Sequence, residues 1–140
     1  MQDAKIAVLM QNDDYGRDYL DGLRAGLGKE AGRIVKVATY EVADPTVDSQ
    51  IIQLKTSGAN VLFNVATPKF AAQAIRKVGE LDWKPAHYLN TISGQVTTLR
   101  QAGFAHAQGI LTAQYGKDPS DPQWAASPDF LEWKAFMQKY

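Results

Sequence analysis

Runs of apolar residues recur along the first 115 positions, and each run has the length of one β-strand. The first run, KIAVLMQ, is apolar at nearly every position, which is the pattern of a strand buried on both faces. The runs IVKVATYEV and NVLFNVA are rich in β-branched residues, which favour strands. The pattern predicts five strands, at 5–11, 34–42, 60–66, 85–90 and 108–115.

The segments between these runs place apolar residues at helical spacing. Tyr15 and Tyr19 lie one helical turn apart after the first run, as do Val47 and Ile51 after the second. Pro68 suits the first turn of a third helix, because proline lacks the N–H that this position leaves unpaired anyway. The pattern predicts helices within 14–29, 44–58, 67–81 and 93–103.

Regular alternation of strands and helices with short connections is typical of a parallel sheet covered by helices on both faces. We therefore predict the α/β class: a three-layer, flavodoxin-like lobe with a five-stranded, mainly parallel sheet. Such sheets bind ligands outside the carboxyl ends of their strands, near the point where the strand order reverses. A binding site is accordingly expected in the loops at 11–17, 42–47, 65–70 and 90–95.

The last 25 residues follow a different pattern. Residues 116–130 contain three prolines and three aspartates without periodicity, which indicates a connector. A helix is predicted after it, with apolar Leu131, Trp133 and Phe136, and no strand follows. We expect 1–115 to form the ligand-binding lobe and 116–140 to be a connector and helix. That helix is expected to be poorly anchored, or to pack on a neighbouring copy, because the part of the protein it fits is missing here.

Composition and charge mainly exclude certain classes of function. Fifteen basic residues balance fifteen acidic ones among 140, so no net field attracts nucleic acid or an anionic membrane. The absence of cysteine excludes thiolate metal sites, disulfides and cysteine nucleophiles. No apolar run approaches the roughly 18–20 residues that span a bilayer. The start MQDAKIAVLM is too short for a secretory signal, which is expected elsewhere in the parent gene.

An acidic pair, Asp13 and Asp14, directly follows the first strand, where response-regulator receiver domains bind magnesium. Such domains also need a phosphoacceptor aspartate at the end of the third strand, and this chain has Asn64 and Thr67 there. Lys117 would have to supply the lysine that follows the fifth strand. Because phosphotransfer without the acceptor has no nucleophile, we interpret one aspartate of the pair as the cap of the first helix.

Other catalytic and cofactor motifs are incomplete. The glycines of GLRAGLGKEAG lie within the first helix instead of the strand-to-helix turn that cradles phosphate. His87 and His106 have no carboxylate at ligand spacing, so no metal site is predicted. Ser93 does not fit a G-x-S-x-G nucleophile elbow and is interpreted as a helix N-cap. The sequence therefore predicts no cofactor and gives no support for catalysis.

The loops at the carboxyl ends do offer groups that recognise a small molecule. Free N–H groups at helix N-termini suit a carboxylate or carbonyl, and nearby aromatic and hydroxyl side chains add stacking and directional hydrogen bonds. We expect Tyr15 to contact the ligand, Phe70 to wall the pocket and the other residues to supply polar contacts. The predicted ligand-binding residues are Tyr15, Gly16, Thr67, Phe70, Asn90, Thr91 and Ser93.

Three segments carry a family resemblance: KIAVLMQNDDYGRDYLDGLRAGL, DSQIIQLKTSGANVLFNVATPKFAAQAIRKVGEL and PAHYLNTISG. Over about residues 4–115 the chain resembles one lobe of type I periplasmic binding proteins. More narrowly, it is similar to the branched-chain amino-acid (Leu/Ile/Val-type) substrate-binding proteins of ABC transporters. The resemblance implies two α/β lobes that close on a small-molecule ligand about hinge crossovers, of which this chain is the second. It also implies a periplasmic or other extracytoplasmic location and ABC permease subunits as partners.

The resemblance also assigns residues and exposes one departure. In that family the tyrosine of the Y-G turn faces the ligand, which corresponds to Tyr15, and the loop after the third strand contributes near Thr67. The loop after the fourth strand supplies an acid for the ligand's ammonium, but here it reads LNTISGQ. Since an unpaired ammonium in a closed cleft is costly, a carboxylate or neutral ligand, aromatic acids included, fits this loop better than an amino acid-like ligand, which stays an alternative. The alternative functions are a ligand-sensing domain of a regulator or receptor, and a receiver-like phosphotransfer domain.

Overall fold

The computed structural model describes residues 3–119 and 121–140. Its centre is a five-stranded sheet in the order β2-β1-β3-β4-β5, and every neighbouring pair of strands is parallel. The predicted α/β class and parallel sheet are therefore confirmed. The strands are β1 (Ile6–Gln11), β2 (Ile34–Tyr40), β3 (Val61–Val65), β4 (Ala86–Leu89) and β5 (Leu111–Thr112).

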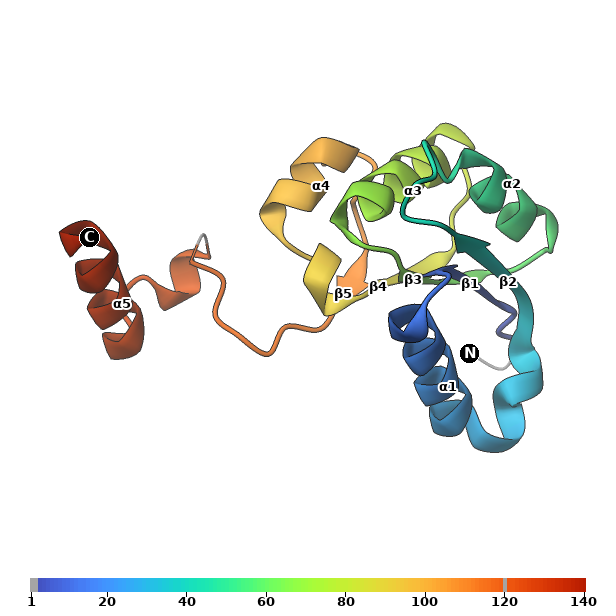
Figure 1. The fold of residues 1–140 in the computed structure, drawn as a ribbon, viewed down its shortest axis with the longest axis horizontal. Coiled ribbons are helices and arrows are strands. Elements are labelled where there is room, and N and C mark those ends of the chain that lie inside the picture. The colour runs from blue at the N-terminus through green and yellow to red at the C-terminus, as the bar shows by residue number, and fades with distance from the viewer. Residues whose placement is uncertain (1–2, 120) are drawn as a thin grey trace.

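Helices cover both faces of this sheet, but unequally (Figure 1). The helix α1 (Asp14–Leu27) covers one face, whereas α2 (Asp48–Thr56), α3 (Pro68–Glu80) and α4 (Val96–Ala102) cover the other. Short 3-10 helices occupy Gly28–Arg33, Thr91–Ser93 and Pro122–Trp124. The four helices expected within the lobe are all present.

The central strand β1 explains why its sequence is apolar throughout. Ala7 and Leu9 point to the side of α2 and α3, while Val8 and Met10 point to the side of α1, so both faces of β1 are buried. β1 is also where the strand order reverses, because the chain passes from β2 on one side of it to β3 on the other. The carboxyl ends of β1 and β3 therefore border the crevice where such sheets bind ligands.

The face that carries α1 is open beyond β3. Phe63 on β3 is half-buried, and Tyr88 on β4 and Leu111 on β5 are exposed, at 42% and 52%. A strand residue on the opposite face, Leu89, is buried under the α3 and α4 side. The sheet thus keeps an apolar surface over β4 and β5 that no helix of the described chain covers.

The fifth strand is much shorter than expected. The sequence predicts a strand at 108–115, but only Leu111–Thr112 pair with β4, opposite Tyr88 and Leu89. The cause is local: Gly109 adopts a φ of +78°, and the residues before it form consecutive turns that follow α4. The chain therefore reaches the sheet edge only after Gly109 and leaves it again within three residues.

The helix α5 (Pro128–Lys139) lies at the end of the connector, away from the sheet (Figure 1). None of its residues is buried, and Trp133, Phe136 and Met137 are each about half-exposed. Its ion pair, between Lys117 and Asp129, joins it to the connector instead of the lobe. The boundary between lobe and connector at residues 115 and 116 remains a prediction.

Deletion of residues 116–140 tests that boundary. Because no residue of α5 is buried and the Lys117–Asp129 pair lies wholly within the deleted segment, we expect a melting temperature unchanged to within about 2 °C. Thermal unfolding followed by far-UV circular dichroism measures it. The control Ile75→Ala, in the core, should lower the melting temperature clearly. A comparable drop on deletion would mean that the connector and α5 belong to the lobe.

Candidate functional site

A hydrogen bond at the carboxyl edge of the sheet joins Tyr15 to Asn90. The side-chain amide nitrogen of Asn90, directly after β4, donates to the Tyr15 hydroxyl oxygen at 2.7 Å. Tyr15 lies in the first turn of α1, so two loops that are 75 residues apart in sequence meet at one point. The structure thus brings together two of the residues that the sequence singles out.

Asn90 is held in place by further bonds that fix the orientation of its amide. Its Nδ2 also donates to the carbonyl of Ala66 at 2.9 Å, and its Oδ1 accepts from the backbone N–H of Ser93 at 2.9 Å. Asn90 is 5% exposed, so these contacts form inside the protein. A buried amide with all of its bonds made is rigid, and Asn90 therefore positions Tyr15.

Ser93 has a different role from the predicted one. Its hydroxyl donates to the carbonyl of Ala66 at 2.7 Å, and the side chain is fully buried. It does not cap a helix, since α4 begins after Gln95 and Asn90 caps the short 3-10 turn at Thr91–Ser93. The expectations of an N-cap and of a direct ligand contact are both corrected: Ser93 ties the loop after β4 to the loop after β3.

A second polar group, formed by Gln11, Tyr40 and Thr67, lies at the ends of β1, β2 and β3. The Tyr40 hydroxyl accepts from the Thr67 backbone N–H at 2.9 Å and is 3.2 Å from the Thr67 hydroxyl. The Thr67 hydroxyl donates to Gln11 Oε1 at 3.4 Å. Burial raises the pKa of Tyr40, against the opposite influence of its bonds to Thr67. Sequence reasoning missed Gln11 and Tyr40, although each is the last residue of a strand that ends at this edge.

Phe70 belongs to the core instead of the pocket wall. It is 2% exposed, and its ring packs against the Tyr40 ring with centroids 4.3 Å apart. It occupies the first turn of α3 as expected, but at a position that turns toward the sheet. The expectation that Phe70 lines the pocket is therefore corrected: it supports Tyr40, which in turn holds Thr67.

One aspartate of the acidic pair, Asp13, caps α1, as interpreted. Asp13 Oδ1 accepts from the backbone N–H of Gly16 at 3.0 Å, and this bond is the main cause of a lowered pKa at Asp13. Gly16 itself is buried, and a Cβ there would lie 2.0 Å from the carbonyl oxygen of Gln11. Gly16 is therefore not placed to contact a ligand. It lets α1 approach β1 closely enough to bring Tyr15 over the sheet edge.

Tyr15 is half-buried, with its ring edge-on to the Tyr19 ring at a centroid distance of 5.0 Å. Burial, reinforced by the neighbouring Tyr19 and Tyr40, raises the pKa of Tyr15 well above its usual value. The hydroxyl is therefore neutral at any physiological pH and keeps its hydrogen for donation.

Two hollows meet at Thr91, which is half-buried and follows Asn90 directly. One, of about 340 Å³, has largely apolar walls; the other, of about 700 Å³, lies between α4 and the segment after β5. The first is lined by residues that include Tyr19, Phe63, Tyr88, Leu111 and Ala113, and the second by residues that include Gln95, Arg100, Gln114, Tyr115 and Lys117. Thr91 lines both hollows, and Asn90, which bonds to Tyr15, lines the first of them.

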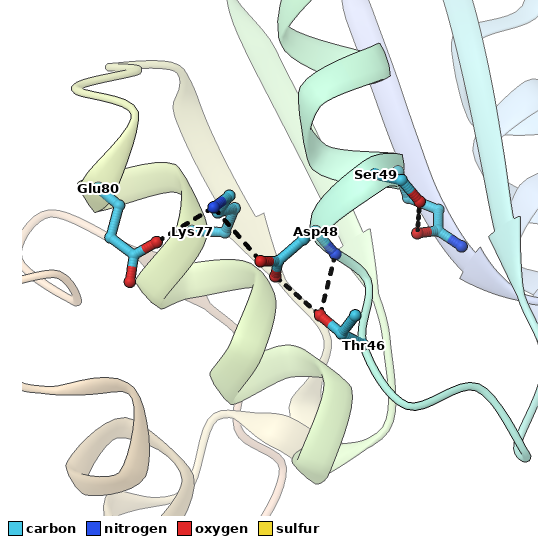
Figure 2. A network of polar contacts seen from close by, with 6 residues as sticks. Thr46, Asp48, Ser49, Lys77 and Glu80 are labelled. Atoms are coloured by element: carbon cyan, nitrogen blue, oxygen red, sulfur yellow. Dashed lines mark hydrogen bonds and ion pairs between the residues drawn. The ribbon is translucent and has the colours of Figure 1, made fainter.

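The loop at 42–47 serves the helix packing instead. Figure 2 shows Lys77 of α3 between Asp48 and Glu80, 3.3 Å from each carboxylate, and Thr46 bonded to Asp48. The hydrogen bond to Asp48 is the main cause of a raised pKa at Lys77. These contacts join the start of α2 to the end of α3.

The His, Asp and Glu side chains are dispersed in the part of the chain that the structure describes. No three His, Cys, Asp or Glu side chains there are grouped to hold a metal ion. Asn64, at the position where a receiver domain has its phosphoacceptor, is fully buried, and its Nδ2 lies 3.2 Å from His87 Nε2. Within residues 3–119 and 121–140, no helix combines the length and the apolar character that a bilayer crossing requires.

The sheet order, the strand directions and the helices on both faces are those of one lobe of a type I periplasmic binding protein. The chain belongs to the periplasmic binding protein family, whose sequence profile matches residues 1–140. The fold expected from the sequence resemblance is thereby confirmed. A comparison with curated protein sequences gave no match.

Several solved structures share this fold. The chain is 22% identical to a substrate-binding periplasmic protein from Ralstonia solanacearum, with a TM-score of 0.82 over 93% of this chain and 36% of that one. It is 20% identical to a branched-chain amino-acid ABC transporter protein from Thermus thermophilus with bound valine, with a TM-score of 0.81 and coverage of 98% and 35%. It is 19% identical to a fatty-acid ABC transporter substrate-binding protein from Thermomonospora curvata, with a TM-score of 0.74 over 98% of this chain and 34% of that one. The chain thus spans about a third of the length of these proteins.

Proposed function

We propose that this chain is the ligand-binding lobe of an extracytoplasmic solute-binding protein that captures a small molecule and delivers it to an ABC importer. The observation that carries the proposal is the buried Asn90 amide, which fixes the Tyr15 hydroxyl at the carboxyl edge of a parallel sheet. That edge is where sheets of this topology bind ligands. Membership of the periplasmic binding protein family supports it.

In this proposal the lobe supplies one wall of a cleft and a second lobe supplies the other. The ligand binds the closed arrangement better than the open one and shifts the population toward it, and the permease subunits recognise the closed form. Tyr15 and Thr91 contact the ligand directly, and Thr67 adds a polar contact from the end of β3. Asn90, Ser93 and Gly16 hold these groups in place. No cofactor, metal or catalytic group takes part.

A titration of the 140-residue chain with single compounds tests the proposal. The panel contains organic acids, amino acids and neutral aromatic compounds, and the readout is backbone amide shifts in two-dimensional NMR spectra. Because only one wall is present, we expect dissociation constants on the order of millimolar. The shifts should be confined to the loops at 11–17, 65–67 and 90–95.

Two outcomes would contradict the proposal. One is that no compound shifts these loops; the other is that all shifts fall elsewhere, for example around Lys77 and Glu80. Micromolar or tighter binding in calorimetry would support ligand capture but would contradict the idea that this lobe is half of a site.

A further inference from the structure

The direction of the hydrogen bond between Asn90 and Tyr15 is determined by the other bonds of Asn90. Its Oδ1 accepts from the backbone N–H of Ser93, so the other end of the amide is the NH₂ group. One hydrogen of that group goes to the Ala66 carbonyl and the other to the Tyr15 hydroxyl oxygen. Tyr15 is consequently the acceptor in this bond, and its own hydroxyl hydrogen points to something else.

The neighbouring Tyr19 does not change this balance. Its ring packs edge-on against Tyr15, and the two side chains interact. If Tyr15 donates to the Tyr19 hydroxyl, the Tyr19 hydrogen is released for another partner; if it does not, the Tyr15 hydrogen is released. In both arrangements the pair offers one O–H donor.

The carboxylates near this edge of the sheet make contacts within their own chain. Asp13 accepts from Gly16, and Asp14 pairs with Arg17. Glu41 accepts from Asn12, Asp44 accepts from the backbone N–H of Glu41, and Asp118 also has a partner. None of these carboxylates is a hydrogen-bond partner of Asn90 or of the Tyr15 hydroxyl in its bond with Asn90, so the polar link at this edge contains no anion.

Lys69 is a cation near this edge of the sheet that forms no ion pair with the described residues. Lys69, in the first turn of α3 beside Thr67, lies over the Phe70 ring and donates to the backbone carbonyl of Asp44. Among the described residues it has no carboxylate within ion-pair distance. Its charge is thus available to an anion that approaches from the cleft.

We infer that the ligand presents to the Tyr15 hydroxyl a carboxylate without a neighbouring ammonium, and that Asn90 is the residue that sets this preference. The inference rests on the proposed function and narrows it to non-amino organic acids. The chemistry is a matching of donors and acceptors: a carboxylate only accepts, an ammonium only donates, and this edge offers donors.

Pairs of compounds that differ only in the amino group test the inference in the same NMR titration. Suitable pairs are 3-phenylpropanoate with phenylalanine and 4-methylpentanoate with leucine. We expect each acid to bind about tenfold more tightly than its amino acid, the cost of an ammonium without an anionic partner.

Two variants separate the donor role of Tyr15 from its bulk. Tyr15→Phe keeps the ring and should weaken acid binding about tenfold, whereas the control Tyr140→Phe, at the exposed tyrosine that follows α5, should leave it unchanged. Asn90→Asp replaces the donor beside Tyr15 with an acceptor, which would take the Tyr15 hydrogen. The preference for the acid should then be lost or reversed.

The possible results distinguish this inference from the proposed function. Amino acids that bind as tightly as the matched acids, or a Tyr15→Phe variant with undiminished acid binding, would overturn the inference and leave ligand binding intact. Absence of binding by every compound would overturn both. Because Asn90→Asp alters a buried network, its amide spectrum is compared with the unsubstituted chain first; if that variant unfolds, the Tyr15→Phe result decides.

Discussion

Replacing Gly16 with alanine is expected to lower the free energy of unfolding by about 3 kcal/mol. A Cβ at this position would lie 2.0 Å from the Gln11 carbonyl oxygen and 3.1 Å from its carbonyl carbon. Both are backbone atoms of the last residue of β1, so neither moves as a flexible side chain would. The helix α1 must therefore shift away from the sheet, and Tyr15 in the adjacent position shifts with it.

Gly22 provides a matched control within the same helix. It is exposed, and a Cβ there would meet nothing within 4 Å, so Gly22→Ala should stabilise the chain by about 0.5–1 kcal/mol through helix propensity. Urea unfolding followed by circular dichroism measures both variants. If Gly16→Ala is as stable as the unsubstituted chain, α1 does not depend on this close approach.

Lowering the pH from 7 to 4 is expected to reduce the free energy of unfolding by about 3 kcal/mol through protonation of His87 alone. The ring is buried, and burial lowers the pKa of His87 from 6.5 to about 4. The unfolded chain takes up a proton on this residue below pH 6.5, whereas the folded chain does so only below about pH 4. The contribution of His87 to the free energy of unfolding is therefore fully present above pH 6.5. It falls by about 1.4 kcal/mol for each pH unit as the pH drops toward 4.

The measurement is the free energy of unfolding in urea at intervals between pH 7 and pH 4. His87→Gln removes the titrating group. The loss of unfolding free energy between pH 6.5 and pH 4 should then be smaller by about 1.4 kcal/mol for each pH unit, whatever the effect of the substitution on stability at pH 7. The control His106→Gln, at an exposed histidine, should retain the slope of the unsubstituted chain. If all three chains lose stability in parallel, His87 is not the source.

The fold was predictable because the local signals agree with the tertiary structure. β1 is apolar throughout and is buried on both faces, and Pro68 opens α3 where proline is favoured. β5 was predicted, but too long, because only Leu111 and Thr112 pair with β4 and the turns around Gly109 decide where the chain reaches the sheet. Such a boundary depends on backbone geometry that apolar patterning does not encode.

The site was predictable to the level of loops but not to the level of individual side chains. Tyr15 and Asn90 lie in loops selected by the rule for parallel sheets, and they do meet. Ser93 and Phe70 lie in the same loops but turn inward, the first to a carbonyl and the second to a ring. Which way a loop residue faces is decided by neighbours distant in sequence.

The uneven covering of the sheet has a consequence for handling the protein in solution. Tyr88 and Leu111 meet water directly, beside a half-buried Phe63. β5 has only two residues, so its edge offers little backbone for another chain to extend. Any self-association at this face should therefore proceed through side-chain contact. It should increase with sulfate and be reversed by mild detergent, without gain of β-structure.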